Sequence, residues 1–189
     1  MKDLKEFDIS FVGLKDGLHQ FDYKIEKKFF NFFEYDEFNN SNVKVAVSFL
    51  KKTTMFELHF TFQGWIEVNC DVTNELFQQP IDTSIDVVVK FGDEYNDEYE
   101  DILIIPHSEF KINIAQYIYE ALVLAMPLKR IHPGVNDGTL HSEILEKLKE
   151  FEIRDWEEEL KEDTNSTIDP RWDKLKEIRI EKNINNGTS

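Results

Sequence analysis

The sequence predicts an α+β fold: an antiparallel, open or barrel-like sheet covered by one buried helix and followed by a helical or disordered tail. Apolar side chains alternate with polar ones along residues 56–73 and again along residues 81–91. This period of two is typical of strands that bury one face. Residues 114–126 are apolar almost all the way round, which indicates a helix inside a core. Together these observations predict an antiparallel sheet with one wet face.

The N-terminal segment is expected to supply a short strand and part of the core. Phe7, Ile9 and Phe11 alternate with polar residues, as in a short strand. An aromatic platform for stacked bases would have basic residues interleaved with the rings. In the aromatic cluster that follows, the only adjacent basic residues are Lys27 and Lys28, which precede it and are not interleaved with its rings. We therefore interpret this cluster as core. Its members are Phe29, Phe30, Phe32 and Phe33.

Two strands are predicted next. Residues 43–50 alternate, and residues 51–54 are expected to form a turn. From residue 56 to residue 72 every even position is apolar or glycine, so this long strand should bury its even face. A bend is expected at Gly64, because glycine weakens a strand and often marks a close backbone approach.

Residues 73–80 are turn-like and lead into the strand predicted over 81–91. Residues 92–101 are strongly acidic and are expected to form a loop, followed by a short strand over 102–105. The acidic segment could suggest a metal site. Its carboxylate spacing does not match a calcium-binding EF-hand, however, and a solvated acidic loop is the preferred interpretation.

The buried helix is predicted to span residues 113–126. Asn113 is expected to cap its N-terminus, with Gln116 as the capping-box partner. Pro127 should end the helix, because proline cannot continue it.

A short basic segment follows this helix in an otherwise acidic chain. It contains Lys129, Arg130 and His132 and ends at Pro133. Cationic side chains and backbone groups in such a segment can bind a phosphate. The alternative is an ordinary surface loop after a helix.

The predicted domain organisation is a β-rich domain over residues 1–133 and a tail over residues 134–189. The tail begins as an acidic linker and closes on a short basic amphipathic helix, which Asp169 caps with Pro170 in the first helical position. This last helix carries further candidate binding residues, namely Arg171, Trp172 and Lys174.

The charge and composition limit the possible partners. The 22 basic and 38 acidic side chains give a formal net charge of −16, so the chain as a whole should be repelled by nucleic acids and anionic membranes. Any RNA contact therefore needs a local basic patch. The N-terminus lacks a signal-peptide pattern and no apolar run has membrane length, so we expect a cytoplasmic protein without a membrane partner.

The sequence shows no catalytic constellation, and we predict that the protein is not an enzyme. The single cysteine, Cys70, lies on the apolar face of its strand, which favours an inert buried thiol over a nucleophile. A hydrolase or nuclease that uses His132 with the acidic loop is the alternative. No recognisable base, nucleophile or two-metal carboxylate set supports it.

The order of several short motifs resembles the YceD family, the large ribosomal RNA subunit accumulation proteins. The matching pieces are Cys70-Asp71-Val72-Thr73, the helix over 114–125, the segment from Met126 through Pro127 to His132, and Asp169-Pro-Arg-Trp-Asp-Lys-Leu. The resemblance implies a non-catalytic factor in the synthesis, processing or accumulation of large-subunit ribosomal RNA. Its partner would be that RNA, a ribosomal protein or an assembly factor, bound through the candidate residues of the two basic segments. The alternative is an acidic protein-binding adaptor without RNA contact.

The chain also departs from the family pattern. Many members resemble zinc proteins in carrying two cysteines in the first motif and another thiol after the histidine. Here Thr73 stands in place of the second cysteine, and residues 134–138 contain no thiol. We therefore expect no metal and no cofactor. If Cys70 and His132 still meet, hydrogen bonding or packing is the expected reason.

Overall fold

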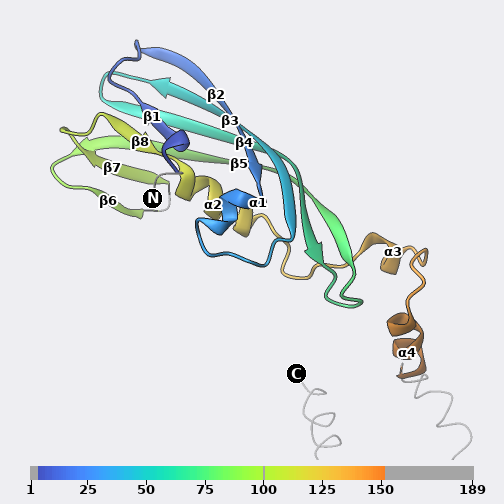
Figure 1. Cartoon of the computed structure of the whole chain (residues 1–189). Coiled ribbons are helices and arrows are strands. Elements are labelled where there is room, and N and C mark those ends of the chain that lie inside the picture. Colours follow the sequence, from blue (N-terminus) through green and yellow to red (C-terminus); the bar gives the residue numbers. More distant parts are fainter. Residues whose placement is uncertain (1–3, 100, 152–189) are drawn as a thin grey trace, which may run out of the picture. The chain divides into compact units, whose positions relative to one another are not determined.

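The computed structural model describes residues 4–99 and 101–151 of the 189-residue chain. Its largest feature is a six-stranded sheet (Figure 1). The strands of this sheet are β2 Gly17–Glu26, β3 Asn40–Lys51, β4 Met55–Asn69, β5 Leu76–Gly92, β6 Asn96–Tyr99 and β7 Ile102–Pro106. They are arranged in the order β2-β3-β4-β5-β7-β6. All neighbours are antiparallel except β5 and β7, which are parallel.

The predicted α+β class and mostly antiparallel sheet are confirmed. Of the two forms that the alternation allowed, the sheet takes the open one: within the described residues, β2 and β6 form its two edges and no pairing closes it into a barrel. A separate small sheet pairs β1 Asp8–Ser10 with β8 Lys111–Asn113. The open sheet leaves one face for the core and one for solvent.

The predicted alternation of β4 and β5 is confirmed. The even positions of β4 from Phe56 to Val68, apart from Gly64, are buried, and the facing odd positions of β5 point to the same side. A continuous antiparallel register joins Met55 with Lys90 and Asn69 with Leu76. This register aligns the two apolar faces, so both strands contribute to one core.

Gly64 marks the place where the backbones of β3 and β4 come closest. It has a φ of +155°, and a Cβ atom there would lie 2.1 Å from the backbone oxygen of Asn42 and 2.8 Å from the Cα of Val43. Only glycine leaves room for this approach. The glycine predicted to bend the strand is therefore a site of close backbone contact.

The strand predicted from residue 81 begins at Leu76, so the predicted turn over 73–80 is correct for residues 73–75 and wrong for residues 76–80. The prediction placed Pro80 in the turn because proline usually disfavours strands. Pro80 faces Trp65 of β4, whereas β7 pairs with β5 only from Val88 onward. Proline is tolerated here because the strand has a described neighbour on one side only.

The acidic segment 92–101 was also expected to be a loop throughout. It contains the short edge strand β6, which pairs with β7 and has a register irregularity between Asn96 and Tyr99. An edge strand needs hydrogen bonds on one side only, so a polar sequence can form it. The predicted short strand after this segment is confirmed as β7.

The N-terminal alternation is confirmed: Phe7, Ile9 and Phe11 are all buried. A carboxylate anchors the small sheet, since Asp8 accepts hydrogen bonds from Lys111 at 2.6 Å and from Asn113 at 2.7 Å. The hydrogen bond from Lys111 lowers the pKa of Asp8 and outweighs the opposing effect of burial. The first and last strands of the β-rich segment are thereby joined.

Two helices, α1 Lys27–Asn31 and α2 Ala115–Leu124, lie on one side of the main sheet (Figure 1). The interpretation of the aromatic cluster as core is confirmed, because Phe29 and Phe30 are buried and Phe33 packs against them, although Phe32 is exposed. The rings of Phe33 and Tyr119 stack at 4.2 Å, which links the cluster to α2.

The predicted helix is confirmed and buries one face, whereas Gln116, Glu120 and Leu124 are exposed and the capping is different from the prediction. Ile114 takes the N-cap position, while the Asn113 side chain accepts a hydrogen bond from the N–H of Ala115 at 3.0 Å. With Ile114 as the N-cap, Gln116 lies at the second helical position and Tyr117 at the third, so Gln116 is not at the capping-box position. The N–H of Ile114 donates to the carbonyl of Phe7. Gln116 instead donates to Glu120 one turn later, at 2.8 Å.

Two short helices follow, α3 Pro133–Asn136 and α4 Glu143–Phe151. The chain divides into two compact units, Met1–Leu145 and Glu146–Ser189. The predicted basic helix, with Arg171, Trp172 and Lys174, lies outside the described residues. No helix in the described part of the chain is both long enough and apolar enough to cross a membrane.

Candidate functional site

The turn after β4 meets the segment after α2, although they are far apart in the sequence. The N–H of Asp71 donates to the carbonyl of Arg130 at 2.8 Å, and the N–H of Arg130 donates to the Asp71 carboxylate at 2.6 Å. The N–H of His132 donates to the Cys70 sulfur at 3.3 Å. We name this contact between residues 70–75 and 129–134 the joint.

The first half of the joint is the tight turn between β4 and β5. The N–H of Cys70 donates to Glu75, and the N–H of Asn74 donates to Cys70, each at 2.8 Å. Asn74 adopts a φ of 59°, which asparagine tolerates better than most residues. Thr73 is only 3% exposed, although its odd position predicted the wet face. The reason is that the strand period ends at Asn69 and no longer governs the turn.

The prediction that Cys70 is a buried thiol is confirmed, and the turn surrounds its sulfur with donors. Burial opposes ionisation most strongly. Hydrogen bonds from the His132 backbone, the Thr73 side chain and backbone, and the Val72 backbone act the other way, and the net pKa of Cys70 is lowered. At 2% exposure the sulfur acts as a hydrogen-bond acceptor inside the joint.

Arg130, predicted as a contact residue, has its side chain occupied within the protein. Its guanidinium lies 3.2 Å from the Glu37 carboxylate and 3.7 Å from that of Asp71, and its side chain is 26% exposed. Arg130 therefore connects three segments of the first unit. Its neighbour Lys129 is exposed.

His132 lies at the inner edge of the joint. Its Nδ1 accepts a hydrogen bond from the N–H of Gly134 at 2.9 Å, and its ring centroid is 5.6 Å from that of Phe77. The acceptor role of Nδ1 places the proton of a neutral ring on Nε2. The structure thus brings Cys70, Thr73, Arg130 and His132 together, whereas Lys129 remains on the surface.

The residues of the joint do not fit a structural zinc ion. Such a site needs four ligands, usually several thiolates, and the joint supplies one thiol and one imidazole. The Cys70 sulfur already accepts a backbone hydrogen bond, and Nδ1 of His132 is occupied as well. Within the described residues no group of three or more histidine, cysteine, aspartate or glutamate side chains is placed to hold a metal.

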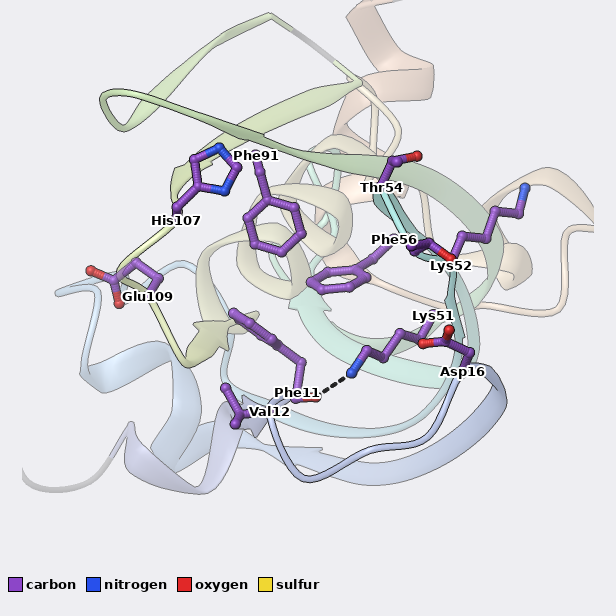
Figure 2. Close-up of a pocket in the computed structure, with 11 residues that line it drawn as sticks. Phe11, Val12, Asp16, Lys51, Lys52, Thr54, Phe56, Phe91, His107 and Glu109 are labelled. Carbon is purple, nitrogen blue, oxygen red and sulfur yellow. Dashed lines mark hydrogen bonds between the residues drawn. The ribbon is translucent and has the colours of Figure 1, made fainter.

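A cavity of about 630 Å³ opens at another edge of the core, next to Phe11, Phe56 and Phe91 (Figure 2). Lys51 lines it but donates to the backbone carbonyls of Phe11 and Leu14, at 3.0 and 2.8 Å. Lys52 is paired with Glu57. Both cations are therefore bound within the protein, and the other titratable groups that line the cavity are Asp16, His107 and Glu109.

Asp86, His59 and Thr61 on the outer face of the sheet form an acid–histidine–hydroxyl arrangement like that of a hydrolase triad. Nδ1 of His59 lies 2.6 Å from Asp86, and Nε2 of His59 lies 3.4 Å from the Thr61 hydroxyl. His59 and Asp86 face each other in the register of β4 and β5 and are exposed. Both side chains face solvent, so we interpret them as a hydrogen-bonded cross-strand pair on a solvated face. Sequence reasoning missed this pair because the facing positions follow only from the register.

The family model for the large ribosomal RNA subunit accumulation protein YceD matches residues 58–179. The chain belongs to the YceD family. The match covers well over half of the chain and includes β4, the joint and α2, while most of the N-terminal third lies outside it. The proposed resemblance is therefore confirmed, and the family is described by the accumulation of large-subunit ribosomal RNA. No curated protein and no solved structure matched the chain.

The joint predicts a clear effect of Asp71. Asp71→Ala removes the 2.6 Å hydrogen bond to the Arg130 N–H and the ion pair with its guanidinium. We expect the free energy of unfolding to fall by about 1–2 kcal/mol, since a backbone donor loses its charged acceptor. Urea unfolding measures this change. Asp71→Asn keeps an acceptor oxygen and should cost clearly less, so equal losses in the two variants would contradict the importance of the hydrogen bond.

Proposed function

We propose that this protein is a non-catalytic cytoplasmic factor that supports the synthesis, processing or accumulation of large-subunit ribosomal RNA. The observation that carries the proposal is the family match over residues 58–179. A structural role for the family motif supports it, since Cys70 and Thr73 hold a turn together and show no arrangement for chemistry. The two clusters that could suggest catalysis, at His132 and at His59, have simpler accounts in hydrogen bonding.

The direct partner is proposed to be either large-subunit ribosomal RNA or a ribosomal protein or assembly factor of the same process. The net charge of −16 favours basic ribosomal proteins on most of the surface. RNA requires a local cationic region. Lys129 is the exposed residue at the start of the 129–134 segment and can contribute to such a contact, whereas Arg130 is already paired with Glu37 and Asp71.

Deletion of the gene tests the proposed function. We expect lower large-subunit ribosomal RNA relative to small-subunit RNA, and fewer free large subunits in a sucrose gradient. A plasmid-borne copy of the wild-type gene should restore both. Normal RNA ratios and normal subunit profiles in the deletion strain would contradict the proposal.

A pull-down from growing cells, with and without RNase, separates the partners. RNA-mediated association should disappear after RNase, while an adaptor that binds only protein should keep its partners. Arg130→Glu is a poor probe because it would place a third carboxylate beside Glu37 and Asp71. Lys129→Gln changes an exposed charge at the same place without this internal cost.

A further inference from the structure

A group of lysines gathers around a tryptophan where the outer face of the main sheet meets the start of α1. It comprises Lys24, Lys27, Lys28, Lys44 and Trp65, which we name the lysine–tryptophan surface. Resting on the proposed role in ribosomal RNA accumulation, we propose that this surface binds a single-stranded segment of large-subunit ribosomal RNA. The lysines would contact phosphates and the indole would stack on a base.

Strand pairing creates the surface. Lys24 of β2 lies directly opposite Lys44 of β3, and one step along the same face Glu26 lies opposite Asn42, which in turn faces Trp65 of β4. The neighbouring Val43 and Val45 are buried, so these side chains belong to the solvent face. Neighbouring strands lie about 4.8 Å apart, and like charges directly opposite each other are destabilising. A bound phosphate would relieve that repulsion.

The surface is hollowed. A depression of about 400 Å³ is lined by Lys24, Lys27, Lys28, Asn40, Asn42 and Trp65. It therefore combines cations with two side-chain amides and one large aromatic ring. Binding of single strands typically uses this combination of a positively charged groove and an aromatic ring on which bases stack.

The local charge is the reverse of the overall charge. Glu26 is the carboxylate in this depression, and it is paired with Lys24 at 2.7 Å. The hydrogen bond and charge of Lys24, together with the charge of Lys28, lower the pKa of Glu26. Among the described residues no ion pair is formed by Lys27, Lys28 or Lys44. An adjoining depression contains Lys24, Lys44 and one more carboxylate, that of Asp22.

RNA fits these features better than another anion. An acidic peptide or an anionic membrane could neutralise the lysines, but neither has planar bases for the indole of Trp65 or for the amides of Asn40 and Asn42. At physiological salt, charge interactions extend about 8 Å. Carboxylates farther away than this repel a bound strand only weakly, whereas Glu26 and Glu67, which lies opposite Asn40, are close to the depression.

Binding of a fluorescein-labelled single-stranded RNA of about 12 nucleotides to the purified full chain tests the proposal. Lys27→Gln with Lys28→Gln should weaken binding about 10-fold at physiological salt, and the slope of log K against log salt should become shallower by about 1.4. Trp65→Leu should weaken binding by about 5- to 100-fold, whereas Trp65→Phe keeps a stacking ring and should retain most of the affinity.

The matched control is Lys15→Gln with Lys90→Gln, which removes two exposed lysines away from the depression. Thermal unfolding of every variant confirms that the fold is kept. Wild-type affinity in the Lys27/Lys28 and Trp65→Leu variants, or an equal loss in the control, would overturn the proposal. Failure of wild-type protein to bind RNA, together with lysine-dependent binding of poly-glutamate, would also overturn it and would point to an acidic protein partner.

The outcome is separable from that of the proposed function. Wild-type RNA binding by the Lys27/Lys28 and Trp65→Leu variants would exclude the lysine–tryptophan surface as the RNA site, but would leave the proposed role in ribosomal RNA accumulation intact. A deletion strain with normal large-subunit RNA removes that role whatever the surface binds. Introducing Lys27→Gln and Lys28→Gln into the complementing gene connects the two, and reduced rescue relative to the Lys15/Lys90 control supports the proposal.

Discussion

Replacing Gly64 by alanine is expected to destabilise the first unit by roughly 3 kcal/mol. The new Cβ would lie 2.1 Å from the backbone oxygen of Asn42, and backbone atoms cannot move aside as the end of a flexible side chain can. The φ of +155° adds strain, since residues with a side chain rarely adopt it. Urea unfolding followed by circular dichroism measures the loss.

Gly13→Ala provides the control for this substitution. A Cβ at Gly13 meets nothing within 4 Å, so its stability should stay close to wild type. Equal midpoints for the Gly64 and Gly13 variants would show that β3 and β4 do not approach each other as described. Because Trp65 follows Gly64 directly, RNA binding by a folded Gly64→Ala variant should also decrease.

Leu122→Ala is expected to lower the free energy of unfolding by about 2–5 kcal/mol, the usual cost of removing a large aliphatic side chain from a core. Leu122 is 0% exposed and lies on the side of α2 that packs into the core. The lost side chain would leave a cavity between α2 and the aromatic core. Thermal unfolding should show the change as a clear drop in Tm.

The same helix supplies a matched control, because Leu124 is 83% exposed. Leu124→Ala makes the same chemical change and adds a good helix former, so the expected effect on stability is close to zero. A loss at Leu124 as large as that at Leu122 would mean that another surface covers this part of α2. The pair of variants thus measures burial separately from helix propensity.

Several predictions depended only on local patterns, and these are confirmed. The even positions from Phe56 to Val68 are buried because a strand alternates its side chains whatever it pairs with. The helix before Pro127 buries the face that carries Ile118, Ala121 and Leu122, because apolar residues at helical spacing pack into the core. The family assignment also depended on local motifs, such as the segment from Cys70 to Thr73.

The wrong predictions lie where a distant segment changes what a local pattern means. Gln116 does not complete a capping box because Asn113 pairs with Asp8 of the N-terminal strand and the helix is capped one residue later, at Ile114. Pro80 lies within a strand because, among the described strands, β4 alone pairs with β5 there. Thr73 is buried because the turn, rather than the strand period, directs its side chain.

The candidate sites divide in the same way. The basic segment after α2 was visible in the sequence, but the pairing of Arg130 with Glu37 and Asp71 was not, and it turns a predicted contact residue into part of the joint. The sequence by itself determined the strands, the buried helix, the family and the overall negative charge, because each follows from neighbouring residues or from composition. Only the tertiary structure decided that Lys24, Lys44 and Trp65 share one surface, because strand register brings together residues that no local period connects.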